Sequence, residues 1–372
     1  MAGGGGDSPV EQAVAGACRA AARDTVERAI EVDVASRIVV ATDHAEWADT
    51  LADLPVVIDL DKSGTPFQFG ARLAGVIERH GIHRAFYLGG GSAPLMDGPT
   101  LRAVADAIRH DDRLIITNNV HSSDWAAFAP AEVVVQHAND LRSDNSLGWI
   151  LLRQGGLAVH EWPRSAATQF DLDTPTDLLI AGLKRPEGSA RPFGSIGPHL
   201  REHIARLGWD DAHVRQAAEV LVTPAKQIII AGRVPQSTWA YLESKTLCWM
   251  RVFSEERGMR ASGRLSSGLV RSLLADYLAL VGFERFFHEM GDLADAMFLD
   301  SRVMMAARGS WPSPADRFYS DLRRPNDIAD PFLREFTAAA LDAPVPVVLG
   351  GHSLVSGGLL ALIDRVAEQQ SN

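Results

Sequence analysis

Short apolar runs alternate with stretches of helical spacing in the first half of the chain. In these stretches apolar residues recur every three or four positions, as Leu73, Val76 and Ile77 do, which predicts helices over 71–80 and 100–110. Five apolar runs are the predicted strands: 37–41, 55–59, 85–88, 114–117 and 132–135. Strands that alternate with helices are typical of a mostly parallel sheet covered on both faces. Ligands of such sheets bind beyond the carboxyl ends of the strands, so the loops after the strands are the candidate sites.

The pattern changes after a stretch rich in Pro, Gly, Ser and Arg over 184–197, which indicates a linker. Helical spacing dominates beyond it, and the predicted helices cover 199–207, 212–222, 238–258, 266–290, 293–307 and 331–341. Their aromatic and Met residues are interpreted as core between packed helices rather than as a ligand pocket. The sequence therefore predicts an α/β fold: a Rossmann-like sheet domain over 1–183, followed by a mainly α-helical domain over 198–372.

Composition and charge disfavour two classes of protein. The 372 residues include 36 Lys and Arg against 47 Asp and Glu, a net charge of −11, and 46% are hydrophobic. Up to Leu183 the chain has 14 basic and 25 acidic residues, and beyond it 22 of each, so all the excess acidity lies in the first half. A nucleic-acid-binding protein needs an excess of basic residues. A disordered chain lacks so large an apolar fraction.

Cysteine usage and hydropathy predict the compartment. Cys18 and Cys248 lie far apart and follow no metal or disulfide spacing, which is typical of a reducing compartment. Glycines stand where a signal peptide would have a basic start and an apolar run, and no apolar stretch approaches about 18 residues. We expect a cytoplasmic protein without a membrane partner.

Four glycines, Gly3, Gly4, Gly5 and Gly6, stand near the start of the sequence. Glycine loops let backbone N–H groups approach an anion closely, and they hold phosphates when they follow a strand and precede a helix. Here the preceding strand is missing or very short. Two interpretations stay open: a nucleotide-binding loop, or a flexible terminus left by cloning.

A predicted strand runs directly into Gly89, Gly90, Gly91 and Ser92. A tight turn from strand to helix needs one or two glycines, so three glycines and a serine favour a substrate-binding loop over a structural turn.

Asn118, Asn119 and Asp124 follow the next predicted strand. Adjacent amides and an acid offer donors and acceptors to a small polar ligand. Alternatively, Asp124 caps a helix that begins at Trp125. A similar but weaker polar run covers 139–146.

Asp171 and Asp173 precede a strong signal for the start of a helix, Thr174 followed by Pro175. The two aspartates alternate along an extended segment, so only one of them can point to a given side. Carboxylate oxygens are ligands that Mg²⁺ prefers, which makes Asp171 and Asp173 candidate metal ligands.

In this order, the four motifs resemble those of nucleotidyltransferases with a GT-A-like Rossmann sheet, particularly the molybdenum-cofactor and phospholactate guanylyltransferases. The resemblance covers roughly 1–183 and includes the segment 170–178, which is similar to the family's Asp-Thr-Pro-x-Asp-Leu. It implies that the opening glycines hold the nucleotide and that Arg19 stands in place of a family Lys.

The resemblance implies nucleotidyl transfer from an NTP to a small phosphorylated or hydroxylated metabolite. An acceptor oxygen attacks the α-phosphorus and pyrophosphate leaves, while the protein positions the reactants and neutralises charge. Arg19 and Asp173 are the expected catalytic residues, with Mg²⁺ on Asp171 or Asp173. The loops that contain Gly89 and Asn118 are expected to line the acceptor side.

Two departures from the family pattern favour an alternative. Ser92 stands where the family places a metal-binding Asp before a Pro, and Gly6-Asp7-Ser8 lacks the usual basic residue. Arg19 cannot be deprotonated and binds phosphate as a fork, so it is not equivalent to Lys. The alternative is a catalytically degenerate protein that binds a nucleotide or sugar phosphate. Its helical half would then mediate homodimerisation or partner binding.

Three features of the second half support weaker hypotheses. Ser353 invites comparison with a hydrolase nucleophile, but the elbow needs a Gly two positions later, which is absent. Residues 345–349 are either a strand that leads into an anion-binding turn or part of a plain turn before a helix. The arginines over 251–271 are interpreted as solvated, because acids such as Glu255 and Glu256 are interleaved with them.

Overall fold

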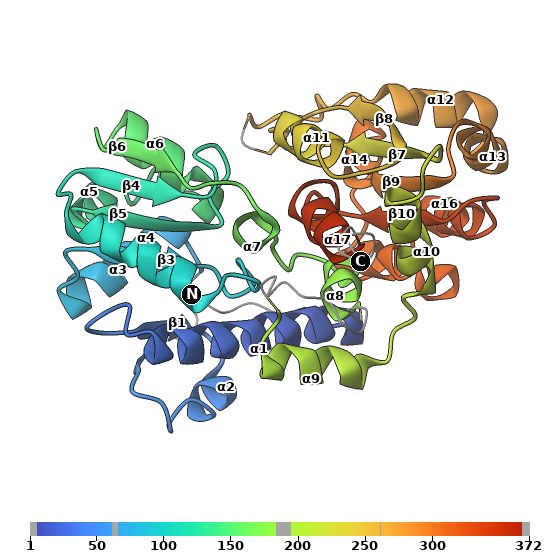
Figure 1. The fold of residues 1–372 in the computed structure, drawn as a ribbon. Helices are drawn as coiled ribbons and strands as arrows, with labels where there is room; N and C mark the ends of the chain where they lie inside the picture. The colour runs from blue at the N-terminus through green and yellow to red at the C-terminus, as the bar shows by residue number, and fades with distance from the viewer. Residues whose placement is uncertain (1–5, 62–65, 184–194, 261, 367–372) are drawn as a thin grey trace. The chain divides into compact units, whose positions relative to one another are not determined.

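The structure is a computed structural model that describes residues 6–61, 66–183, 195–260 and 262–366 (Figure 1). These residues form two compact units. The first unit contains the described residues of Ala15–Asp171 and Gly194–His203. The second unit contains the described residues of Gly6–Val14, Leu172–Phe193 and Ile204–Asn372. The domain boundary expected at Leu183 stays a prediction, because 184–194 of the expected linker lies outside the described residues.

Strands and helices alternate in the first unit. Strands β1 to β4 confirm the predictions at 37–41, 55–59, 85–88 and 114–117, and α3 and α4 confirm the helices at 71–80 and 100–110. The elements up to Asp171 are α1 (Pro9–Glu31), β1 (Val39–Thr42), α2 (Ala45–Asp49), β2 (Val57–Leu60), α3 (Phe69–His80), β3 (Ala85–Leu88), α4 (Gly98–Arg109), β4 (Leu114–Thr117), β5 (Trp125–Ala129), α5 (Glu132–Gln136), η1 (Asp144–Ser146), α6 (Leu147–Arg153), β6 (Ala158–Glu161) and α7 (Ala166–Gln169).

The first unit contains two sheets. Strands β1 and β2 pair in parallel, and a four-stranded sheet has the order β3-β5-β4-β6. Strand β5 is antiparallel to both of its neighbours, whereas β4 and β6 are parallel. Successive residues of β5 face opposite sides: Trp125 packs with Leu101 of α4, and Phe128 packs with Leu73 of α3. The four-stranded sheet is therefore covered by helices on both faces.

The structure corrects two predictions in this unit. Residues 132–135, predicted as a strand, form the helix α5, and Trp125, considered as a helix start, begins β5. Val133 and Val134 of α5 pack against Phe69 of α3 in one core, and this packing overrides the strand preference of β-branched residues. Strand β5 is buried at every position, and periodicity cannot distinguish such a run from a buried helix.

The second unit has a parallel sheet of four strands in the order β8-β7-β9-β10. Its core on one face combines Ile229, Met297 and Leu349 of the strands with residues of α12, α13, α14 and α16, while α10 contacts β7, β9 and β10 and also packs against α17. The elements after Asp171 are α8 (Pro175–Gly182), α9 (Pro198–Leu207), α10 (Ala212–Leu221), β7 (Gln227–Gly232), α11 (Gln236–Glu243), β8 (Trp249–Ser254), α12 (Leu273–Val281), α13 (Phe283–Leu293), β9 (Ala296–Asp300), α14 (Arg302–Ala307), α15 (Pro314–Asp321), η2 (Pro325–Asp327), α16 (Pro331–Leu341), β10 (Val347–Gly350), η3 (Leu354–Gly358) and α17 (Leu359–Val366).

The expectation of a mainly α-helical domain over 198–372 is therefore wrong in its architecture. The predicted helices 238–258 and 293–307 contain β8 and β9, and the strand considered at 345–349 is present as β10. Strands β9 and β10 are buried at every position, so they lack the alternating pattern that identifies a half-exposed strand. The chain as a whole belongs to the mixed α/β class.

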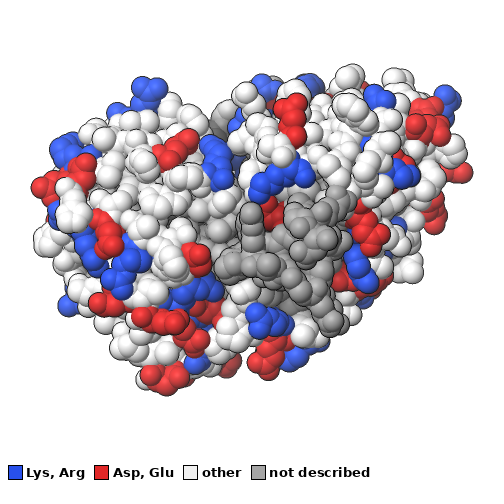
Figure 2. All heavy atoms as spheres, viewed as in Figure 1, with Lys and Arg blue, Asp and Glu red and all other residues white. Residues whose placement is uncertain are grey.

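The surface gives few pointers to function. Basic and acidic side chains are interspersed over the face drawn in Figure 2, without a large area of one sign. Among the described residues, no helix is both long and apolar enough to cross a bilayer. A candidate site has therefore to be found from the contacts of individual side chains.

Candidate functional site

The loop after β3 is tied to two other segments of the first unit. Ser92 is 5% exposed, and its hydroxyl donates to the backbone carbonyl of Asp124 over 2.8 Å. Ser92 also forms an antiparallel bridge with Asp171, and the N–H of Ala93 donates to the carbonyl of Phe170 over 3.1 Å. The predicted substrate loop, the turn after β4 and the segment that ends at Asp171 therefore meet at Ser92.

The first of the three loop glycines has an identifiable role. The N–H of Gly89 donates to the Asp124 carbonyl over 3.4 Å, and a Cβ at this position would lie 2.5 Å from Ser92 Oγ. Only glycine fits beside the Ser92 hydroxyl without displacing it. Gly90 and Gly91 are half-buried, and their assignment as substrate-binding residues stays a prediction.

The loop after β4 is closed by a pair of side chains. Asn118 is 1% exposed, donates from Nδ2 to Asp124 Oδ2 over 2.6 Å, and accepts on Oδ1 from the Asp124 N–H over 3.1 Å. Asn119 accepts on Oδ1 from the N–H of His121 over 3.1 Å, which is a contact within its own turn. The structure thus brings Ser92, Asn118 and Asp124 together, and it shows Asn119 in a local turn.

Three carboxylates act on one buried tyrosine at this place. Tyr87 is 7% exposed, and its hydroxyl donates to Asp144 Oδ2 over 3.3 Å. Burial raises the pKa of Tyr87 well above its ordinary value, and the charges of Asp144, Asp171 and Asp124 raise it further. The sequence indicated Asp144 only weakly, because a polar run in a loop is also what an ordinary turn contains. Three carboxylates thus act on one buried hydroxyl, but among the described residues only Asp24, Glu27 and His199 bring three potential metal-ligand atoms within 4.8 Å of one another.

The predicted metal ligands Asp171 and Asp173 belong to different units, the first to residues 15–171 and the second to the segment that begins at Leu172. The N–H groups of Asp173 and Thr174 donate to Asp177 Oδ2 over 3.1 and 2.8 Å, which fixes the start of α8. This confirms the helix start predicted at Pro175. Asp177 is fully buried, and burial and the charge of Asp173 raise its pKa to about 7.

The predicted nucleotide-binding residues are described only in part. Gly3, Gly4 and Gly5 lie outside the described residues. Beside Gly6, a Cβ would lie 2.0 Å from Glu11 Oε1, so the Glu11 carboxylate occupies the space next to this glycine. Glu11 also accepts from the Ser8 hydroxyl over 2.6 Å in the first turn of α1. Arg19 is half-buried on the same helix, and its catalytic role stays a prediction.

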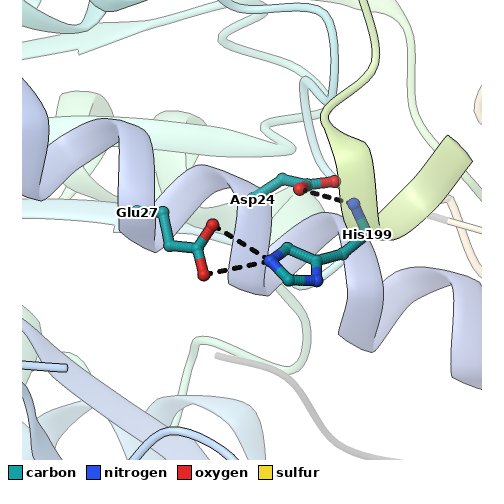
Figure 3. Close-up of side chains that lie close together, drawn as sticks. All are labelled: Asp24, Glu27 and His199. Carbon is teal, nitrogen blue, oxygen red and sulfur yellow. Dashed lines mark hydrogen bonds and ion pairs between the residues drawn. The ribbon is translucent and has the colours of Figure 1, made fainter. Parts of the chain in front are cut away.

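A cluster that the sequence analysis missed links α1 and α9. Ligand atoms of Asp24, Glu27 and His199 lie within 4.8 Å of one another (Figure 3). Asp24 accepts from the N–H groups of His199 and Leu200 over 3.0 and 2.9 Å, and His199 Nε2 lies 3.0 Å from both Glu27 oxygens. A Cβ on Gly197 would lie 2.1 Å from Asp24 Cγ, so glycine is required for this approach. The three-residue spacing of Asp24 and Glu27 on one helix face was the available signal.

The sequence matches no family model and no curated protein. Strands β3 and β4 run in the same direction, because β5 is antiparallel to both, so their carboxyl ends lie at one edge of the sheet. Ligands of α/β sheets bind at such an edge, and Ser92, Asn118 and Asp124 lie there.

Proposed function

We propose that the first unit is a GT-A-like nucleotidyltransferase domain that transfers NMP from an NTP to a small phosphorylated or hydroxylated metabolite. The observation that carries the proposal is the meeting of the loops after β3 and β4 with the segment that ends at Asp171. This puts amide, hydroxyl and carboxylate groups at the edge of the sheet where α/β proteins bind their ligands.

The chemistry follows from the charge of the reactants. An oxygen of the acceptor attacks the α-phosphorus, the bond from this phosphorus to the α,β-bridging oxygen breaks, and that oxygen leaves with pyrophosphate. Asp124, Asp144 and Asp171 offer only oxygen ligands, which suit Mg²⁺, and Mg²⁺ when bound neutralises charge on the triphosphate. Asn118 holds the Asp124 carboxylate in place through its two hydrogen bonds. Arg19 is the proposed contact of the triphosphate, and Asp173 is the alternative metal ligand.

The first test measures binding of ATP, GTP, CTP and UTP to the full chain by calorimetry, with and without Mg²⁺. Binding of at least one nucleotide should require Mg²⁺ and weaken by at least about tenfold in Asp171→Asn, since one charged ligand is lost. Asp112→Asn is the matched control, because Asp112 is 87% exposed and pairs only with Arg84 among the described residues. No nucleotide binding under any condition contradicts the proposal.

The second test separates transfer from binding. The protein, Mg²⁺ and each α-³²P-labelled NTP are incubated with a pooled extract of small metabolites, and labelled products other than NMP and NDP are separated. The proposal expects a labelled product and equimolar pyrophosphate, both lost in Asp171→Asn.

A second candidate is a catalytically degenerate protein that binds a nucleotide or sugar phosphate. The observation that favours it is Ser92, whose hydroxyl is engaged with the Asp124 carbonyl at the position where a carboxylate would be expected. If the protein is such a degenerate binder, its nucleotide affinity should not depend on Mg²⁺, and no labelled product should form. The two tests together therefore distinguish the candidates.

A further inference from the structure

The sheet of the second unit has a switch point, where successive strands are added on opposite sides of β7. Strand β8 lies on one side of β7, and β9 and β10 lie on the other. The loops after β7 and β9 therefore lead to opposite sides, and open α/β sheets bind their ligands at this switch point. The backbones approach closely here, because a Cβ on Gly232 would lie 2.5 Å from Asp300 Cβ.

Two arginines directly after these strands have acidic partners. Arg233 follows β7 and binds Asp300 at the end of β9, with Nε and a terminal nitrogen 2.6 and 3.0 Å from its two oxygens. Arg302 follows β9 and is buried, and it binds both oxygens of Asp321 over 2.6 and 2.5 Å. These pairs fix the arginines in place and neutralise them.

Two further arginines have no ion-pair partner among the described residues. Arg260 is exposed and Arg317 is half-buried, and their guanidinium groups lie 5.9 and 4.7 Å from the centre of the same Trp311 ring. The acids near Arg260 in sequence are engaged elsewhere: Glu256 pairs with Arg264, and Glu255 accepts from the Ser272 hydroxyl over 2.7 Å. From the sequence, Glu255 and Glu256 are interpreted as acids that balance the arginines of this segment. Since both have other partners, neither forms an ion pair with Arg260.

The four arginines are close enough to act on one another. Although Arg260 is exposed as a residue, partial desolvation of its guanidinium group lowers its pKa. Arg233 and Arg302 lower it further, while Asp173 and Asp300 oppose the effect. Burial also lowers the pKa of Arg317 to about 10, with further contributions from Arg302 and Arg260. Such crowding of like charges is relieved when an anion binds between them.

The loop after β10 adds an unsatisfied polar atom to this edge. His352 follows Gly350 and Gly351, and its ring forms a hydrogen bond with the Arg233 backbone. Its Nδ1 is buried without a hydrogen-bond partner among the described residues. Burial and the charge of Arg233 lower the pKa of His352 to about 4, so the ring is neutral at pH 7. A neutral ring that donates from one nitrogen accepts on the other, so Nδ1 is suited to a ligand hydroxyl.

We propose that this edge of the second unit binds a small phosphate monoester that also carries a hydroxyl group, with the phosphate held by Arg260 and Arg317 and the hydroxyl donating to His352 Nδ1. Guanidinium groups offer planar forks of donors that match the oxygens of a phosphate group. The proposed site uses residues of the second unit only, and it needs no metal because no ion pair among the described residues neutralises Arg260 and Arg317.

The test uses the full chain labelled with 5-fluorotryptophan, in the presence of EDTA and without nucleotide. The ¹⁹F resonance of Trp311, assigned with Trp311→Phe, is followed while inorganic phosphate or glycerol 3-phosphate is added. We expect a saturable shift, tighter binding of glycerol 3-phosphate than of phosphate, and at least about tenfold weaker binding of both in Arg260→Gln and Arg317→Gln.

Three controls make the outcome decisive. Arg285→Gln removes an arginine that is 70% exposed on α13, and it should bind both probes like the wild type. His352→Gln keeps a donor toward the Arg233 backbone and removes Nδ1, so it should lose the preference for glycerol 3-phosphate. Asp171→Asn, which tests the first unit, should leave the titration unchanged. A shift that stays linear through the millimolar range, or equal affinity in the three arginine variants, overturns the proposal.

Discussion

The two units place polar side chains at equivalent positions but give them opposite charge. In the first unit, Asp124, Asp144 and Asp171 act on Tyr87 near the carboxyl ends of β3 and β4. In the second, Arg233 and Arg302 follow β7 and β9 directly and pair with two aspartates. Two further arginines, Arg260 and Arg317, have no ion-pair partner among the described residues. Strand topology therefore determines where polar side chains lie close together, whereas the identity of single loop residues determines the charge of the ligand that these side chains can bind.

The largest effect that separates the units is expected from Arg302→Met. This change leaves Asp321 buried without its partner, which should lower the free energy of unfolding of the second unit by about 3–5 kcal/mol. Urea unfolding with hydrogen exchange read separately for 15–171 and 204–366 measures it, and the loss of protection should be confined to the second range. Arg285→Gln, with an exposed pair, should change stability by less than about 0.5 kcal/mol. A loss below about 1 kcal/mol in Arg302→Met would show that the buried pair is not a major source of stability.

A second prediction concerns metal dependence, where the opposite charges should produce opposite behaviour. EDTA should weaken nucleotide binding by at least about 100-fold, because an acidic site needs a cation to hold a triphosphate. The same treatment should leave phosphate binding at Trp311 unchanged. Calorimetry and ¹⁹F titration on one sample provide both readings. If EDTA affects both or neither, the contrast between an acidic and a basic site is wrong.

A third prediction concerns acid. His213 in the second unit is 5% exposed, and burial, with help from Arg323, lowers its pKa to about 4 although Asp210 and Asp211 oppose this. The unfolded chain therefore binds a proton that the folded chain does not, so stability is lost as pH falls from about 6.5 towards 4. The loss attributable to His213 approaches at most about 3.5 kcal/mol once the pH is below both pKa values.

The second unit also contains Asp177, whose raised pKa stabilises the folded state as pH falls from about 7 and so opposes the effect of His213. A comparison of His213→Phe with the wild type cancels the contribution of Asp177 and isolates that of His213. The difference in unfolding free energy between His213→Phe and the wild type should change in favour of the variant below pH 6. In the first unit, hydrogen bonds from Arg72, His80 and Arg79 outweigh burial and lower the pKa of Asp59 to about 2, so its contribution persists to lower pH. A difference that does not depend on pH would contradict the assignment.

The sequence predicted the elements whose pattern is local. Strands β1 to β4 were predicted because turn residues bound each run. The proximity of Ser92, Asn118 and Asp124 could be anticipated because they lie in the loops after β3 and β4, whereas their role in binding stays a prediction. Strands β5, β6, β7, β8 and β9 were not predicted, and three of them, β5, β8 and β9, show why. The first and last of these are fully buried and show no alternation, and β8 lies at the end of a run of helical spacing.

Contacts between distant residues could not be predicted in the same way. Arg260 and Arg317 are far apart in sequence and meet at Trp311 only through the fold, and the acids beside Arg260 suggested a solvated segment. The contact of Asp144 with Tyr87 could not be predicted from either segment, because the two residues are 57 positions apart. A spacing rule identifies what one segment can offer, but it does not say which other segment lies opposite.

The smallest expected change in stability comes from the cluster of Asp24, Glu27 and His199. Variants of this cluster test whether it is a structural link between α1 and α9 or a metal site. Asp24 already accepts two backbone N–H groups at the start of α9, so Asp24→Ala should cost about 0.5–2 kcal/mol of stability, as the loss of a helix cap does. Glu27→Gln alters two partly exposed ion pairs, with His199 and with Arg23, and should cost less than about 1 kcal/mol. Thermal unfolding with added Mn²⁺ or Zn²⁺ decides between the two roles. A structural link gains nothing from the ion, because its carboxylates are already satisfied by donors of the protein. Stabilisation by the ion that disappears in Asp24→Ala would instead assign the cluster to a cation.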